Sequence, residues 1–263
     1  MNPCIIVYID ILGFGNYVLK NSLEDCLTIL QLFDTGSSSI RDVAFAMHTY
    51  SFEKNQIQSP SSKIPIEYKY FLLSDSVVIA IELNEQGSAE QFYMLIHMLI
   101  DFQVKMFEKN LPLRGGISVG EFYSQENILL GKGLVNAVSL EKSAISPRIL
   151  IDKLLLNTFN VVDKKIIGTM LSEDNDGNVF IDLFKYFGRS KAFEDAGTPN
   201  IQWFKESSQS FFEIIQEYLN SNRDNKRLES KLSWVQKKMN EFNSFLVAVP
   251  LLFSFDVNYS VFL

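Results

Sequence analysis

Two segments of the sequence each place one aspartate at the edge of an apolar run, and this pattern constrains the fold most. The run Cys4–Ile9 predicts a buried strand that ends at Asp10. Gly13 and Gly15 follow and predict a turn. Burying a lone carboxylate costs free energy unless it is paired or binds a metal. Asp10 therefore needs a partner.

The second aspartate interrupts a predicted hairpin. Tyr68–Leu73 predicts one strand, Ser74–Ser76 a tight turn around Asp75, and Val77–Ile81 the returning strand. Two carboxylates at the ends of core strands suggest a divalent-metal site able to handle phosphates. The alternative interpretation of Asp10 and Asp75 is a pair of turn-capping residues.

The remaining pattern predicts a mixed domain followed by helices. The 263 residues, 47% hydrophobic, suffice for one sizeable core with an appendage. After the hairpin, the predicted elements are a helix over Ala89–Lys109, a strand over Leu113–Phe122 with closely packed Gly115 and Gly116, a helix within 131–144, a strand over Val179–Phe184, and helices over Trp203–Leu219 and Leu228–Phe242. We expect an α+β domain at 1–187 and a helical C-terminal region at 188–263.

The composition excludes several classes of protein. With 24 Lys and Arg against 31 Asp and Glu, the net charge of −7 argues against binding to a nucleic acid polymer. Two cysteines and two histidines predict neither a disulfide framework nor a zinc site. The sequence shows no signal peptide and no apolar run long enough to span a membrane, so we expect a soluble, cytoplasmic protein without a membrane partner.

The order of these motifs resembles the class III nucleotidyl cyclase catalytic domain. Asp10–Phe14 matches that family's Asp-Ile-x-Gly-Phe, and Ser74–Ser76 stands where the family usually has Gly-Asp. Arg114–Gly120 matches Arg-x-Gly-Ile-x-x-Gly, and Val135–Ala137 matches the start of the Val-Asn-x-Ala helix. The resemblance covers roughly residues 3–185. It implies a ferredoxin-type central sheet flanked by helices.

Within that family, the chain is most similar to the bacterial pyrimidine cyclases of Pycsar antiphage systems. The similar features are Leu73–Ser76, Arg114–Ile117, the stretch from Leu140 to Ile149, and Lys231–Trp234. This resemblance implies a uridylate or cytidylate cyclase that converts UTP or CTP to a 3′,5′-cyclic nucleotide and pyrophosphate. The product would be a second messenger that activates a separately encoded effector.

The resemblance also implies roles for individual residues. Asp10 and Asp75 would hold two Mg²⁺ or Mn²⁺ ions, with the Ile11 carbonyl as a further ligand. The metal ions would favour attack of the ribose 3′-hydroxyl on the α-phosphoryl group. Backbone N–H groups of residues 12–15, including Leu12, Gly13 and Phe14, would cradle the β- and γ-phosphates. Asn136 would come from the other protomer and orient the ribose, so that the active enzyme is a homodimer.

The sequence departs from the family's pattern at two positions. Phe71 stands where purine cyclases carry a base-reading lysine, which favours a pyrimidine, and Tyr50 is a candidate clamp on the base. Leu140 stands where the family has its transition-state arginine. The charge would have to come from elsewhere, with Arg114, Lys132 and Lys142 as candidates.

Other interpretations stay open at this point. Arg114 is equally compatible with a surface ion pair, Asn136 with a helix N-cap and Tyr50 with a half-buried core position. The alternatives for the whole chain are a purine cyclase and a cyclase-like module that binds a nucleotide without turnover. A haloacid-dehalogenase-type phosphatase would need a second acid two residues after Asp10, where Leu12 stands.

Overall fold

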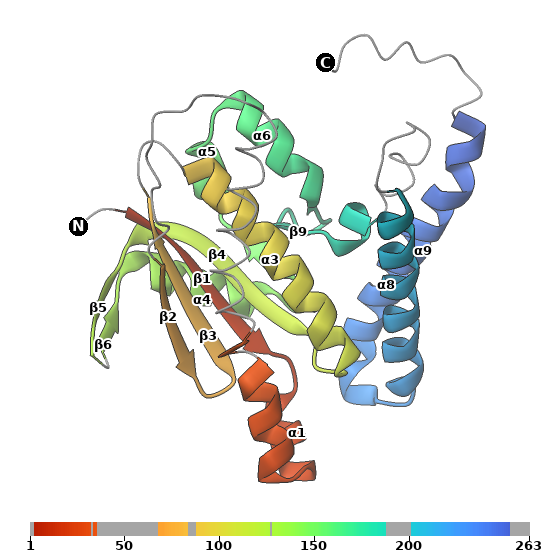
Figure 1. Cartoon of the computed structure of the whole chain (residues 1–263), viewed down its shortest axis with the longest axis horizontal. Coiled ribbons are helices and arrows are strands. Elements are labelled where there is room, and N and C mark those ends of the chain that lie inside the picture. Colours follow the sequence, from red (N-terminus) through yellow and green to blue (C-terminus); the bar gives the residue numbers. More distant parts are fainter. Residues whose placement is uncertain are drawn as a thin grey trace. The chain divides into compact units, whose positions relative to one another are not determined.

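The computed structural model describes residues 3–32, 34–35, 68–83, 88–126, 128–187 and 201–252. Tyr50, the candidate base clamp, lies outside these residues. The chain forms two compact units, Met1–Ile181 and Asp182–Leu263. Figure 1 shows the strands in the first unit and two long helices in the second.

The first unit is built on a seven-stranded sheet with the order β2-β3-β1-β4-β7-β9-β8. Its strands are β1 (Pro3–Ile11), β2 (Tyr68–Leu73), β3 (Ser76–Glu82), β4 (Leu113–Glu121), β7 (Ile149–Ile151), β8 (Leu171–Glu173) and β9 (Val179–Ile181). Only the β4–β7 pair of this sheet is parallel, and the other neighbours are antiparallel. The predicted strands around Asp10 and Asp75 are confirmed, and they lie side by side because β1 pairs with β3.

Helices and one further hairpin complete the first unit. They are α1 (Phe14–Lys20), α3 (Ser88–Glu108), the hairpin of β5 (Tyr123–Gln125) and β6 (Ile128–Leu130), α4 (Lys132–Ser143), α5 (Lys153–Asn157), α6 (Val161–Ile167) and the 3₁₀ turn η1 (Gly168–Met170). Residues 23–32 are also helical. The architecture is α+β, with a large central sheet flanked by helices, as the sequence predicts.

Side chains of β1 alternate between the two faces of the sheet. Ile5, Val7 and Ile9 are fully buried on one face. Ile6 and Tyr8 point to the opposite face, where they pack with Ala137 of α4. Figure 1 shows α3 lying across the sheet. Asp10 continues the series of Ile6 and Tyr8, so its carboxylate lies on the face that α4 covers.

Glycines in β4 allow α4 to lie directly on the sheet. A Cβ atom on Gly116 would lie 2.2 Å from the Ala137 carbonyl oxygen, and one on Gly115 would lie 2.7 Å from the Tyr8 carbonyl oxygen. The hydroxyl of Ser118 donates a 2.5 Å hydrogen bond to the Gly133 carbonyl of α4. The predicted close backbone packing at Gly115 and Gly116 is therefore confirmed.

The second unit is helical. Its elements are α8 (Ile201–Ser221), the 3₁₀ turn η2 (Lys226–Leu228), α9 (Glu229–Leu252) and helical residues 183–187. Phe187 stacks on Phe211 with ring centroids 4.5 Å apart. The predicted strand Val179–Phe184 is wrong beyond Ile181. Asp182 begins a helical segment there, since its side chain accepts a 3.0 Å hydrogen bond from the Lys185 N–H.

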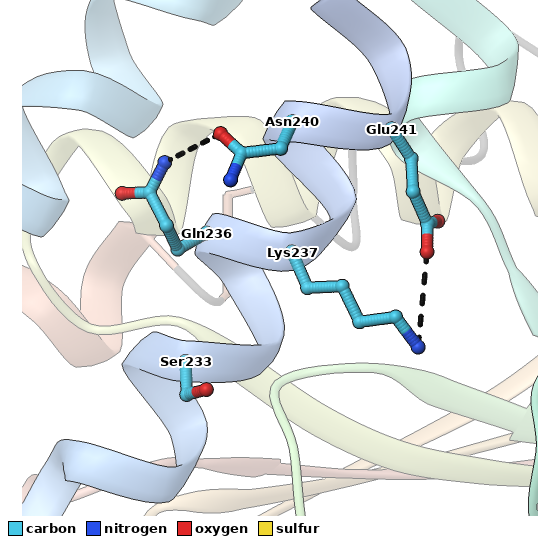
Figure 2. Close-up of a pocket in the computed structure, with 5 residues that line it drawn as sticks. All are labelled: Ser233, Gln236, Lys237, Asn240 and Glu241. Carbon is cyan, nitrogen blue, oxygen red and sulfur yellow. Dashed lines mark hydrogen bonds and ion pairs between the residues drawn. The ribbon is translucent and has the colours of Figure 1, made fainter. Parts of the chain in front are cut away.

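One face of α9 is polar and exposed. Figure 2 shows five residues that line a pocket on this helix, namely Ser233, Gln236, Lys237, Asn240 and Glu241. The Gln236 amide donates to Asn240 at 3.0 Å, and Lys237 lies 3.7 Å from the Glu241 carboxylate. These contacts between residues four apart are ordinary features of a solvated helix face. In the part of the chain that the structure describes, no helix has the length and apolar character needed to cross a bilayer.

Candidate active site

Asp10 and Asp75 meet at one edge of the central sheet. Asp10 pairs in register with Ser76, the first residue of β3, and Asp75 precedes it in the turn. The Ile11 N–H donates a 3.1 Å hydrogen bond to the Asp75 carbonyl, which ties the end of β1 to this turn. The antiparallel pairing of β1 with β3 thus brings together two aspartates that are far apart in the sequence.

The surroundings of Asp10 disfavour its charged form. Burial raises the pKa of the Asp10 carboxyl, the Arg114 guanidinium lowers it, and the neighbouring Asp75 carboxylate raises it again. The net result is a raised pKa, because one cation does not offset burial and a second carboxylate. A cation placed between Asp10 and Asp75 would relieve this cost.

The donor set suits a hard divalent cation. Mg²⁺ is commonly held by one or two carboxylates, with water and substrate phosphates completing its coordination. Among the described residues, no group of three or more His, Cys, Asp or Glu side chains is arranged to hold a metal ion. Asp10 and Asp75 therefore suit an ion whose remaining ligands come from water and the substrate. They do not suit a structural site in which the protein supplies every ligand.

Arg114 links helix α4 to the end of the sheet where Asp10 and Asp75 lie. It lies opposite Asp10 in the β1–β4 register. Its Nη2 atom is 3.1 Å from Asp10 Oδ2 and 2.5 Å from Glu141 Oε1. One guanidinium nitrogen therefore contacts two carboxylates, one on the sheet and one on α4.

Glu141 is a residue of this site that the sequence analysis missed. Its side chain is 5% exposed, against 26% for Arg114. Burial raises the pKa of the Glu141 carboxyl, Arg114 lowers it, and Asp10 raises it again. A signal was present in the sequence, since Gly133, Ala137 and Glu141 follow at intervals of four and share the buried face of α4.

The other two candidate cations lie in different surroundings. Lys132 Nζ is 4.0 Å from Glu121 Oε2, and its side chain is 85% exposed. Lys142 is exposed on α4. Of the three cations that the sequence left open, Arg114 is the one in contact with Asp10.

Asp10 also ends a short chain of hydroxyl groups. The Tyr8 hydroxyl donates to Ser76 Oγ at 3.0 Å, and Ser76 Oγ donates to Asp10 Oδ1 at 3.4 Å. Phe71 packs in the same cluster as Tyr8, with its ring 6.2 Å from that of Phe122. Phe71 therefore lies on the same face of the sheet as Asp10. It is in the row of Val78 and Tyr8, next to the row that contains Asp10.

The segment after Asp10 offers backbone groups to a ligand. The side chains of Leu12 and Phe14 are buried, and Gly13 has a left-handed backbone with φ of 88°. The Leu12 N–H donates a 3.0 Å hydrogen bond to the Pro112 carbonyl. The first N–H groups of a helix have no partner within the helix. The amides of residues 13–15 thus suit the predicted phosphate cradle better than that of Leu12.

Asn136 occupies a different face of α4 from Glu141. Asn136 and Val135 are exposed, whereas Glu141 points to the sheet. Leu140 is partly buried and packs at the Gly116 position, where it would contact an added Cβ atom at 2.6 Å. The structure brings Asp10 together with Asp75 and with Arg114, and it leaves Asn136 facing outward.

These features define an α+β domain with two aspartates and one arginine at the edge of its sheet. No family model and no curated protein matches the sequence. Three similar solved structures are a rhodopsin-guanylyl cyclase catalytic core of converted specificity in complex with ATPαS, an adenylate/guanylate cyclase/hydrolase from Silicibacter pomeroyi, and adenylate cyclases from Trypanosoma brucei.

The likeness to each structure extends over about two thirds of this chain. The rhodopsin-guanylyl cyclase core is 14% identical, with a TM-score of 0.44, covering 69% of this chain and 95% of its own. The Silicibacter protein is 13% identical, with a TM-score of 0.40 and coverages of 68% and 94%. The Trypanosoma structure is 11% identical, with a TM-score of 0.38 and coverages of 69% and 88%.

Proposed function

We propose that this chain is a metal-dependent nucleotidyl cyclase of the class III type that converts UTP or CTP to its 3′,5′-cyclic monophosphate. The supporting observation is that Asp10 and Asp75 meet at one edge of the sheet, with Arg114 in contact with Asp10. The motifs that suggest a cyclase from the sequence are the motifs that supply these residues.

The reaction needs one bond formed and one broken. The ribose 3′-oxygen bonds to the α-phosphorus, its proton passes to solvent, and the bond to the bridging oxygen of pyrophosphate breaks. Asp10 and Asp75, with the Ile11 carbonyl, would hold two Mg²⁺ or Mn²⁺ ions. When bound, such ions stabilise the charge on the transferring phosphoryl group and make the hydroxyl more acidic.

The residues of the chain contribute positioning and charge. The Arg114 guanidinium lies beside Asp10, where it can interact with phosphate oxygens of the substrate. The amides of residues 13–15 would bind the β- and γ-phosphates. Asn136, exposed on α4, would reach the ribose of the neighbouring protomer, so that the active enzyme is a homodimer.

Phe71 supports a pyrimidine substrate. It presents an aromatic side chain on the Asp10 face where purine cyclases present a lysine, so a purine would lose a hydrogen-bond donor there. We favour UTP over CTP on resemblance alone. On the same basis, the product would serve antiphage defence by activating a separate effector.

A second candidate function is nucleotide binding without turnover. The observation that favours it is the ion pair between Arg114 and Asp10, which occupies a carboxylate that a metal ion would need. Leu140, in place of the family's transition-state arginine, agrees with it. A purine cyclase is the third candidate, and it differs only at the base.

Mass spectrometry of products from all four nucleoside triphosphates with Mn²⁺ tests these candidates. We expect a cyclic pyrimidine nucleotide from the wild type and none from Asp75→Asn. Asp224→Asn, which changes an exposed aspartate in the second unit, is the matched control and should retain full activity. A cyclic purine would contradict the substrate assignment, and no cyclic product from any triphosphate would contradict the enzyme.

A further inference from the structure

Glu141 gives Arg114 a second carboxylate partner besides Asp10. Both carboxylates contact the same Nη2 atom, Asp10 at 3.1 Å and Glu141 at 2.5 Å. This nitrogen donates a hydrogen bond to Asp10 Oδ2, and its contact with Glu141 Oε1 is an ion pair. Because Glu141 is the more buried of the two carboxylates, it depends more strongly on this cation.

The position of Glu141 is fixed by its helix. An added Cβ atom on Gly116 would lie 2.2 Å from the Ala137 carbonyl oxygen and 3.0 Å from the Glu141 nitrogen. The backbone of α4 therefore rests on that of β4, which fixes the place from which the Glu141 side chain reaches Arg114. Arg114 is the more mobile partner, because its side chain is longer and more exposed.

Glu141 does not act as a third ligand in this arrangement. Among the described residues, no three acidic, histidine or cysteine side chains are placed to hold one metal ion. Its direct contact is with Arg114, and Arg114 in turn contacts Asp10. The contact through which Glu141 would influence a cation at Asp10 and Asp75 is therefore its ion pair with the arginine.

We propose that Glu141 is a positioning residue that holds Arg114 in the site when Asp10 exchanges the arginine for a metal ion. This inference rests on the proposed function, since it assumes a divalent cation at Asp10 and Asp75. A metal ion would displace the guanidinium from Asp10. Glu141 keeps the displaced guanidinium beside the site, where it is available to phosphate oxygens, and lowers the cost of the exchange.

The test is a double-mutant cycle on the full chain. In each variant, electron paramagnetic resonance measures the binding of Mn²⁺ in the absence of nucleotide. Glu141→Gln leaves Arg114 with Asp10 alone, so we expect the Mn²⁺ dissociation constant to rise at least about fivefold, within the range of couplings between contacting residues. Arg114→Gln removes the competitor at Asp10, so we expect tighter Mn²⁺ binding. In the Arg114→Gln background, Glu141→Gln should change Mn²⁺ binding by less than about twofold.

Two outcomes overturn the proposal. An equal effect of Glu141→Gln with and without Arg114 would mean that Glu141 acts on the cation by itself. Unchanged or weaker Mn²⁺ binding by Arg114→Gln would mean that Arg114 does not compete at Asp10. If circular dichroism shows that Glu141→Gln does not fold, Mn²⁺ binding by Arg114→Gln still tests the proposal. Glu121→Gln, on a carboxylate that pairs with Lys132 instead, is the control for loss of one negative charge.

The cycle also separates this proposal from the proposed function. A wild-type protein that binds no Mn²⁺ refutes both. A protein that binds Mn²⁺ with the expected coupling but cyclises no nucleotide refutes only the enzyme. If the enzyme is active, Glu141→Gln should lower kcat more than it raises KM for the nucleotide, and Glu141→Asp, which keeps the charge, should restore part of kcat.

Discussion

Two arginines of the first unit each contact a pair of carboxylates, but in different surroundings. Arg148 is 4% exposed, contacts Asp174 and Asp176, and lies over the Phe180 ring. It joins the start of β7 to the turn between β8 and β9. Arg114 is more exposed and contacts Asp10 and Glu141. Burial indicates a structural role for Arg148, whereas the role of Arg114 in the reaction is part of the proposed function.

The pairing of Arg148 makes stability depend on pH. Burial raises the pKa of Asp176, but hydrogen bonds from Arg148 and Asn178 outweigh it and lower the pKa from 3.8 to about 2. The folded state therefore binds fewer protons than the unfolded state in this range. The resulting stability is present above pH 3.8 and is lost as the pH falls toward about 2.

We expect Asp176→Asn to flatten the fall in stability between pH 4 and pH 2, measured by urea unfolding at several pH values. Asp224→Asn, at an exposed position of the second unit, should leave the wild-type profile unchanged. Equal profiles for Asp176→Asn and wild type would contradict the role assigned to the Arg148 pair.

A residue-scale prediction concerns the base. In Phe71→Lys, a donor replaces the aromatic ring on the Asp10 face, and we expect the ratio of cyclic purine to cyclic pyrimidine product to rise by about tenfold or more. The readout is competition between equal UTP and ATP or GTP. Leu72→Lys, one residue along β2 and on its opposite face, is the control. An unchanged ratio would exclude Phe71 from base selection.

At the scale of elements, the packing of α4 on β4 decides where the site's charges lie. Gly116 and Gly120 let the helix backbone approach the strand, and this approach brings Glu141 to Arg114. The same packing turns Asn136 outward. A substitution that disturbs the packing of α4 on β4 should therefore change both the stability of the first unit and the geometry of the candidate site.

Gly116→Ala should destabilise the first unit by about 1–3 kcal/mol, the usual cost of overpacking, and it should weaken Mn²⁺ binding. Gly15→Ala is the matched control, since nothing lies within 4 Å of its added Cβ atom. In helix α1 that change should be neutral or stabilise by about 0.5–1 kcal/mol. Urea unfolding measures both variants, and equal midpoints would contradict a close helix–strand contact.

The sequence predicted the elements of this site better than its contacts. The strands around Asp10 and Asp75, and helices α3 and α4, follow from apolar periodicity and glycine turns, which are local signals. The Arg114–Asp10 contact joins residues 104 apart and depends on the β1–β4 register. Glu141 was missed for the same reason, since its partner is known only once α4 is placed on the sheet.

At the scale of the whole molecule, the proposed site is incomplete in one protomer. Asp10, Asp75 and Arg114 lie together, and Asn136 faces outward on α4. Exposed apolar residues of the first unit include Val135 of α4 and Ile128 and Leu130 of β6. We propose a homodimer that covers them. We also propose that residues 1–187 form the catalytic domain and that the helical region at 188–263 is appended to it.

Complementation tests the homodimer. Asp75→Asn and Asn136→Ala should each be inactive alone, whereas a mixture should recover about a quarter of wild-type activity, because half of the dimers are mixed and each contains one intact site. Light scattering gives the oligomeric state in parallel. A monomer with full activity, or a mixture that recovers none, would contradict a shared site.

The central place of β1 has a consequence for the synthesis of this protein. Strand β1 precedes both of its partners in the chain, β3 and β4, which end at Glu82 and Glu121. At a rate of synthesis of about 5–20 residues per second, roughly 5–20 s pass between the synthesis of β1 and that of β4. Until β4 is made, the edge of β1 that pairs with β4 stays unpaired in the nascent chain. We therefore expect a nascent chain that ends before β4 to be prone to aggregation.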